Sequence, residues 1–484
     1  MLHACKRGPL TSAMVVGCAA FGLLAGATAL ADGPGWEFTP VVELDQVYSD
    51  NIALNPSGDE DGEFVTAIDA SIGALREGAQ SRLQADYRFL GVAYWSEDEQ
   101  KGYHQLNGGG MVEVVPDRFR IEGSASYFQR QRSRGGVGGD LINLGVDRFD
   151  VFDLQLSPIY TQTFGNTAST EVRYTFGLVD YDDSAVQDNS STRNQLRAVV
   201  ESGPAFSTVG WQLSFNRSVT DFDDGVKVTL QTAEALARWI YSPRLNLFAA
   251  VGDDNNRFEQ NLGNSGTSGT SWRTGVEWAP STRTKGDIFF GERFFGRTYG
   301  GNLEHRFRDG LVFARYSENL QTVNVRSGGF NVSLVDPEID PGLVEDGDVP
   351  DIFSGVFLSR SFSLGLTLRR PKSELTARIF RDDREFDVTR PDERGQGLRL
   401  DAGWQWMPRT RLFGDLRLEE RTFSQIQDRT DTIFETRLGV GRSIGPQMEA
   451  TVNYLFRQRD SSGSSASGFD YTENRITATI SRSF

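Results

Sequence analysis

Cysteine is almost absent from the chain, since its 484 residues include only Cys5 and Cys18. Both lie in the first 31 residues, where Lys6 and Arg7 precede a mostly apolar stretch that ends in the small residues of a cleavage site at 29–31. We therefore expect residues 1–31 to be a secretory signal peptide and residues 32–484 to be a mature chain without disulfides. A lipoprotein signal ending in VVGC at Cys18 is the alternative.

Long hydrophobic runs are also missing after the signal peptide. No later stretch approaches the run of about 18 apolar residues that a membrane helix needs. Hydrophobic residues make up 38% of the chain, yet aromatic residues reach 11% and glycines number 52. This combination suits a sheet in which every second residue faces water. If the mature chain spans a membrane, we expect it to do so with strands.

Lysine is scarce, with five among the 50 basic residues. Removal of Lys6 and Arg7 leaves 48 basic against 66 acidic residues, so the formal net charge changes from −16 to −18. This negative charge argues against a nucleic-acid partner. The excess of arginine fits recognition of carboxylates or phosphates, or alternatively the codon usage of a GC-rich genome.

Apolar residues alternate with polar ones over most of the chain. From Leu83 to Phe89 every second residue is apolar, and Gln84, Asp86 and Arg88 stand between them. The ranges 170–178, 209–215 and 412–418 repeat this pattern. Interleaved charges cannot face a dry core, and runs of about 9 to 15 residues have the length of tilted membrane strands. The pattern predicts an all-β, antiparallel transmembrane barrel occupying residues 32–484.

Short turns recur at fairly regular intervals. Ten are expected, at Gly78, Pro116, 164–167, Pro204, Pro243, Pro280, Asp309, Pro371, Pro408 and Pro446. Ten turns imply eleven hairpins, so we predict about 22 strands, within a range of 20 to 24, and a periplasmic location for both termini. Aromatic residues before the turns, including Trp239, Tyr241 and Trp278, are placed for an interfacial girdle. Longer polar loops between the turns are expected on the outer side.

The chain ends with an alternating strand that closes on Phe484. A terminal phenylalanine in this setting is similar to the signal that the outer-membrane assembly machinery recognises. Arg482 departs from the apolar residue that is usual two positions earlier.

The segment WEFTPVVELDQVYSDNIALNPSGDEDGEFVTAIDASIGALREG, residues 36–78, resembles the start of a bacterial family. These are the outer-membrane β-barrel proteins associated with PEP-CTERM and exosortase systems, which are linked to exopolysaccharide gene clusters. Residues 294–320 also resemble the middle region of that family. The resemblance implies an envelope location and a role in polysaccharide or protein export, and it brings no catalytic residues.

Charged residues at alternate positions are candidates for the lining of the lumen. They are Arg118, Arg120, Glu122, Arg130, Arg132, Arg378, Asp415, Arg417, Glu419 and Arg437. One interpretation is an arginine-rich track that guides an anionic polymer. The other is a network of ion pairs that neutralises itself and stiffens the barrel.

The stretch from Ser327 to Gly355 is the longest segment without a strand pattern. Its acidic residues are Asp336, Glu338, Asp340, Glu345, Asp346, Asp348 and Asp351. Loops of this length are usually functional or disordered. The stretch is either a gating loop folded into the lumen or an extracellular cover. Acidic loops at 180–184 and 221–225 bind Ca²⁺, bridge to lipopolysaccharide phosphates through divalent ions, or are simply solvated.

Few residues suggest an enzyme, because the mature chain has two histidines, His104 and His305, and neither has the spacing of a metal site. We expect no catalytic activity, cofactor or metal. A first strand that begins at Trp36 leaves little room for an N-terminal plug, which argues against a TonB-type receptor. The expected function is a pore or conduit for export of exopolysaccharide. A structural or docking protein is the first alternative, and an outer-membrane hydrolase is the second. Expected partners are outer-membrane lipid, lipopolysaccharide, the assembly machinery, and an anionic polysaccharide with periplasmic export proteins.

Overall fold

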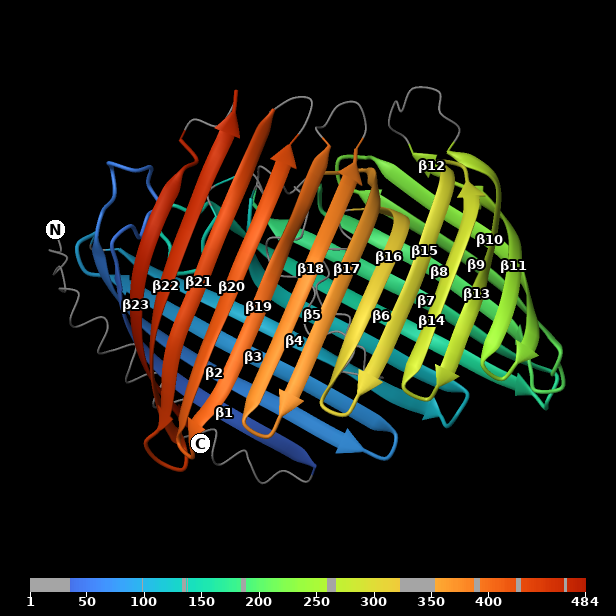
Figure 1. Ribbon diagram of the computed structural model, residues 1–484, viewed down its shortest axis with the longest axis horizontal. Coiled ribbons are helices and arrows are strands. Elements are labelled where there is room, and N and C mark those ends of the chain that lie inside the picture. Colours follow the sequence, from blue (N-terminus) through green and yellow to red (C-terminus); the bar gives the residue numbers. More distant parts are fainter. Residues whose placement is uncertain are drawn as a thin grey trace, which may run out of the picture.

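The protein folds as one closed β-sheet (Figure 1). The computed structural model describes residues 35–97, 99–132, 136, 138–183, 189–258, 267–322, 353–386, 392–423, 428–464 and 468–484. The strands are β1 (Trp36–Ser49), β2 (Glu63–Gly78), β3 (Ser81–Tyr94), β4 (Gln100–Val115), β5 (Phe119–Gln131), β6 (Arg148–Phe164), β7 (Ala168–Asp182), β8 (Ser191–Ser202), β9 (Val209–Phe222), β10 (Lys227–Ser242), β11 (Leu245–Asn255), β12 (Arg257–Phe258), β13 (Ser268–Ser281), β14 (Thr284–Arg293), β15 (Gly296–Phe307), β16 (Gly310–Thr322), β17 (Val356–Arg370), β18 (Ser373–Glu385), β19 (Glu393–Met407), β20 (Thr410–Phe423), β21 (Arg429–Ser443), β22 (Met448–Gly463) and β23 (Tyr471–Ser483).

Pairing between the first and last strands closes the barrel. Strand β1 pairs with β2 along its full length and with β23 from Val41↔Ser483 to Ser49↔Arg475. The short β12 follows β11 after Asn256 and pairs with the same neighbour, β10, so the two form one interrupted strand. The barrel therefore has 22 antiparallel strands, as the alternation and the turns predicted.

All ten predicted short turns connect neighbouring strands at one end of the barrel. Pro243 and Pro371 lie in the β10–β11 and β17–β18 turns, and Gly165 in the β6–β7 turn has φ +56°, a value that favours glycine. The C-terminus lies at the same end, and the longer connections lie at the other (Figure 1). In outer-membrane barrels the short turns are periplasmic and the long loops extracellular.

The outer surface carries the apolar residues of the alternation. Leu213, Ile288 and Leu438 are exposed in mid-strand. Trp239, Tyr241, Trp278, Trp404 and Trp406 are exposed near the short turns, as predicted for an interfacial girdle. The part of the chain that the structure describes contains no helix long and apolar enough to cross a membrane. A closed barrel with an outer apolar band is the construction of outer-membrane proteins, and this is the location of the chain.

The final residue is held against the first strand. The backbone N–H of Phe484 donates a hydrogen bond to the carbonyl oxygen of Pro40 at 3.1 Å. The guanidinium of Arg482 lies 4.8 Å from the centroid of the Phe484 ring. Arg482, which stands where an apolar residue is usual, can therefore still pack against the ring of Phe484.

Candidate functional site

The lumen is lined by the residues that alternate with the lipid-facing rows. On β5, Arg120 and Glu122 face inward and form an ion pair at 2.9 Å. Arg173 on β7 lies 2.8 Å from Glu122, and Glu171 lies 3.6 Å from Arg120. These four charges neutralise one another. Arg118 is an exception to the prediction, because it lies in the turn that precedes β5 and not on the strand.

At the extracellular end of β5, the predicted residues are also engaged with the protein. Arg130 is buried, with 4% of its surface exposed. Arg132 follows the strand and forms ion pairs at 2.6 Å with both Asp147 and Asp183. The hydrogen bonds from Arg132 to Asp183 and Asp147 raise the pKa of its guanidinium, which therefore stays charged.

A second group of predicted charges lies on β18 to β21. Register places Arg378, Arg399 and Arg417 side by side in one row across three strands. The buried carboxylate of Glu419 forms ion pairs with the guanidinium groups of Arg417 at 2.6 Å and Arg421 at 2.5 Å. The guanidinium of Arg399 lies 4.0 Å from it. These contacts make much of this wall an ion-pair network, which is one of the two interpretations left open by the sequence.

The same network extends toward the barrel seam. Arg437 lies 3.7 Å from Asp415. On the next strands Arg457 lies 2.7 Å from Glu435 and 3.3 Å from Glu473. Removing one partner of a buried ion pair costs considerable stability, because it leaves an uncompensated charge. These residues therefore stabilise the wall whether or not the lumen conducts a cargo.

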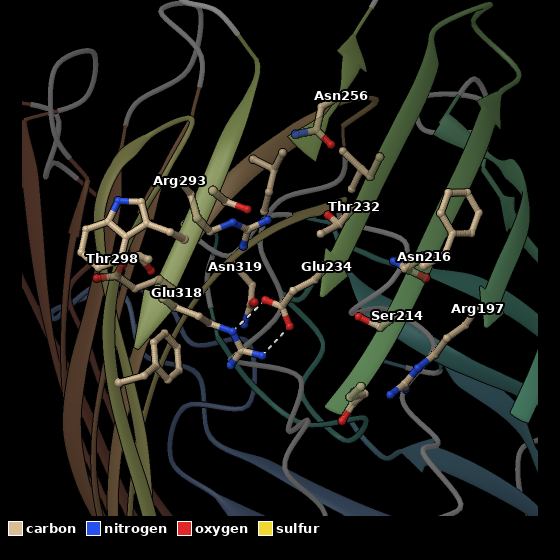
Figure 2. Close-up of a pocket in the computed structure, with 18 of the residues that line it drawn as sticks. Arg197, Ser214, Asn216, Thr232, Glu234, Asn256, Arg293, Thr298, Glu318 and Asn319 are labelled. Carbon is tan, nitrogen blue, oxygen red and sulfur yellow. Dashed lines mark hydrogen bonds and ion pairs between the residues drawn. The ribbon is translucent and has the colours of Figure 1, made fainter. Parts of the chain in front are cut away.

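The wall formed by β8 to β16 contains a cavity of 550 Å³ (Figure 2). Strands β8, β9, β10, β13, β14, β15 and β16 supply its lumenal side chains. Nine of the lining residues carry amides or hydroxyls, namely Gln195, Gln212, Ser214, Asn216, Thr232, Ser271, Thr298, Asn319 and, from the break between β11 and β12, Asn256. Two arginines in it are held by bidentate hydrogen bonds, Arg273 by Glu234 and Arg293 by Asp254.

Arg197 differs from the other arginines of this cavity. Its side chain is exposed, and it forms no ion pair with any residue that the structure describes. Register places it directly opposite Arg173 on β7 and Asn216 on β9. In Figure 2 it lies beside Ser214 and Asn216. Arg197 is not among the predicted lumenal charges, although it occupies a lumenal position of the alternating run 191–202.

The connection between β5 and β6 enters the lumen. We refer to residues 138–147 of this connection as the inserted loop. Leu141, Ile142 and Leu144 pack against an apolar patch on the lumenal faces of β1 to β4, which includes Val65 and Val92. Tyr94 donates a hydrogen bond through its hydroxyl to the carbonyl oxygen of Ile142 at 2.7 Å. The loop therefore covers this wall near the extracellular end.

Polar contacts anchor the inserted loop to the other side of the seam. Arg475 on β23 donates to the Asp140 carboxylate at 2.6 Å, and Arg457 lies 3.9 Å from it. Burial disfavours the charged form of Asp140, but the two arginines outweigh this and hold the pKa of its carboxyl below the ordinary value. Gly145 permits the close approach, because a Cβ there would lie 2.0 Å from the carbonyl oxygen of Ala53.

A second contact narrows the extracellular end of the lumen. Ser354, just before β17, donates to the side chain of Asn189 at 3.0 Å. Val356 packs with Phe222 and Val228 of the β9–β10 hairpin, although β17 is not a neighbour of those strands in the sheet. Parts of the wall that are not neighbours in the sheet thus touch at this point.

The proposed gating loop, with Asp336, Glu338, Asp340, Glu345, Asp346, Asp348 and Asp351, lies outside the described residues. His104 contacts the Tyr87 hydroxyl at 2.7 Å, and His305 contacts the Thr284 hydroxyl at 2.8 Å. Within the described ranges, no group of three or more His, Cys, Asp or Glu residues is placed to hold a metal ion.

Comparison with solved structures identifies the same barrel architecture. The FrpB iron transporter from Neisseria meningitidis (F3-3 variant) is 8% identical, with a TM-score of 0.52 over 94% of this chain and 82% of that one. Its F5-1 variant is 9% identical, with a TM-score of 0.51 over 93% and 83% of the two chains. No family model and no curated protein matches the sequence. The similarity therefore establishes the fold.

Proposed function

We propose that the protein is an outer-membrane conduit for a hydrophilic saccharide cargo and serves export of an exopolysaccharide. The observation that carries the proposal is the polar cavity on the β8 to β16 wall, where amides and hydroxyls line the lumen. Such groups replace the hydrogen bonds that water makes to sugar hydroxyls, so a saccharide moves along this wall without losing its partners.

The size of the barrel supports the same conclusion. A barrel of 22 strands encloses more space than its own side chains fill. Two further lumenal cavities, of 390 and 500 Å³, lie near the periplasmic end and are lined largely by charged and polar residues. The polysaccharide itself is inferred from the family resemblance of residues 36–78 and 294–320, together with a role for periplasmic export partners.

The extracellular contacts give this conduit a narrowed outer mouth. The inserted loop covers the β1 to β4 wall, and Val356 meets the β9–β10 hairpin on another side. The second contact includes Leu230 and Leu320, which also line the polar cavity, so it lies at the extracellular end of the polar wall. We infer that the cargo passes between the two contacts and then along the polar wall.

A structural or docking role is the second candidate. It is favoured by the ion-pair network of β18 to β23, in which Glu419, Asp431 and Glu473 are buried among arginines. A barrel built only to support surface loops would conduct little, whereas a conduit conducts ions whenever cargo is absent. In either role, lipopolysaccharide and the assembly machinery are expected partners.

Conductance distinguishes the two roles. We would refold the mature chain, verify folding by heat-modifiable gel mobility, and record single channels in a planar lipid bilayer. A conduit is expected to give stable open channels, and acidic or neutral oligosaccharides added to one side should block the current. Heat-denatured protein serves as the control. Folded barrels that leave the bilayer silent would contradict the conduit and favour the structural role.

A further inference from the structure

We propose that Arg197 and the amides and hydroxyl beside it form a binding subsite for a carboxylate-bearing sugar. The subsite deepens the proposed function and rests on it, because it assumes a saccharide in the lumen. Its members are Arg197, Gln195, Ser214 and Asn216, which lie on the lumenal faces of β8 and β9. Figure 2 shows Arg197 beside Ser214 and Asn216. The chemistry recognised is an acidic sugar unit, with the carboxylate on the arginine and the hydroxyls on its neighbours.

The first argument is charge. In the cavity, Arg273 and Arg293 each have a carboxylate in bidentate contact. The remaining acid, Glu318, accepts from the Tyr316 hydroxyl at 2.6 Å and has Arg360 at 3.9 Å. Arg197 has no such partner among the described residues. It is the uncompensated positive charge of the cavity, and a guanidinium fork matches a carboxylate with two parallel hydrogen bonds.

The second argument is the placement of Arg197 in the sheet. Like charges directly opposite one another on paired strands are destabilising. Arg197 faces Arg173 in the β7–β8 register. The nearby acid Glu122 is engaged with Arg173 at 2.8 Å and with Arg120 at 2.9 Å, so it leaves the positive charge of Arg197 unbalanced. An anion on the lumenal side of Arg197 would relieve this repulsion. The arrangement therefore favours a bound anion over an empty site.

The third argument is the composition of the surroundings. The Gln195 amide donates to the side-chain oxygen of Asn216 at 2.8 Å, which fixes both side chains. The Oε1 of Gln195 and the Nδ2 of Asn216 are left as an acceptor and a donor for a ligand. Ser214 adds a hydroxyl on the next lumenal position of β9. A free inorganic anion needs only the arginine, whereas these neutral groups suit the hydroxyls of a sugar.

The test uses hexagalacturonate as the acidic probe and maltohexaose as the neutral one. Both are added to single channels of the full mature chain, and the concentration for half-block is measured. Arg197→Gln is expected to raise this concentration about tenfold for hexagalacturonate, since a hydrogen-bonded charge is lost. Block by maltohexaose should be unchanged. Arg197→Lys should fall between, because it keeps the charge and loses the fork.

A matched control removes the same charge elsewhere in the lumen. Arg315 lies between Asn302 and Ser363 in register, is exposed, and lies outside the cavity. Arg315→Gln should leave the block by hexagalacturonate nearly unchanged. If Arg315→Gln weakens the block as much as Arg197→Gln does, the block results from general attraction by lumenal positive charge, and the subsite is refuted.

The outcomes separate this inference from the proposed function. Stable channels whose block by hexagalacturonate is the same in wild type and Arg197→Gln would overturn the subsite and leave the conduit standing. Silent bilayers would overturn the conduit. In that case calorimetric titration of the barrel in nanodiscs with hexagalacturonate still tests the subsite, and equal affinity of wild type and Arg197→Gln would refute it.

Discussion

Replacing Asn143 with alanine should release the inserted loop from the lumenal wall. Asn143 is 1% exposed and holds the centre of the loop. Its Nδ2 donates to the carbonyl oxygen of Ile52 at 3.1 Å and to Glu473 at 3.3 Å. Its Oδ1 accepts from the backbone N–H of Asp140 at 2.9 Å and from Arg457 at 3.2 Å.

The expected size of the effect follows from these four hydrogen bonds. The bond to Ile52 joins the loop to the wall, and the bond from the Asp140 N–H holds the loop in its docked conformation; both are neutral and contribute about 1 kcal/mol each. The contacts with Glu473 and Arg457 contribute about 1 kcal/mol more together, less than usual for charged groups, because these two residues remain 3.3 Å apart as an ion pair. Asn143→Ala should therefore reduce the free energy of loop docking by about 3 kcal/mol, a factor of about 100 in the docked population.

Hydrogen exchange measures that population directly. The backbone N–H of Leu144 donates to the carbonyl oxygen of Ile52 at 3.1 Å and exchanges when the loop leaves the wall. In Asn143→Ala this amide should exchange about 100-fold faster. Asn55→Ala, which removes an exposed hydrogen bond to Asp59 in the neighbouring loop, should change it little. Unaltered exchange of Leu144 in folded Asn143→Ala would refute this account of loop docking.

Two further predictions concern acid and assembly. The pKa of Asp140 is lowered in the folded protein, so the stability it contributes is present above the ordinary carboxyl pKa and is lost only as pH falls through the lowered value. In the wild type, the protection factor of the Leu144 amide should thus stay constant from about pH 7 to about pH 4. In Asp140→Asn it should be lower over this whole range. A loss of protection in the wild type that is centred at the ordinary carboxyl pKa would count against the Arg475 contact. Deletion of Phe484, which removes a backbone hydrogen bond to Pro40 and the terminal aromatic ring, should lower the folded fraction in cells, measured by heat-modifiable mobility. Phe484→Tyr should behave as wild type, and equal assembly after the deletion would argue against a terminal signal.

Particular elements show which parts of the structure were open to prediction. Alternation along 83–89 and 209–215 predicted their lipid-facing rows, and prolines such as Pro243 and Pro371 predicted turns between strands. The inserted loop was missed, but a signal existed. Leu90, Val92 and Tyr94 occupy lumenal positions of β3 and are apolar, so alternation ends there because another apolar segment covers them. Leu141, Ile142 and Leu144 of the inserted loop are that segment.

The sequence by itself determined the strands, the turns, the count of 22 and the face that meets lipid, because period-two alternation and turn chemistry are local properties of the chain. Only the tertiary structure decided which lumenal charges neutralise one another and which remain. Arg173 and Arg197 face each other through strand register, while Asp140 and Arg475 meet although 335 residues separate them. Such contacts depend on how the sheet closes into a barrel and on where a loop packs against its wall. Neither can be predicted from the residues that neighbour each charged group in the sequence. The arrangement of charges in the lumen, on which the proposed function depends, is therefore set by the closure of the barrel.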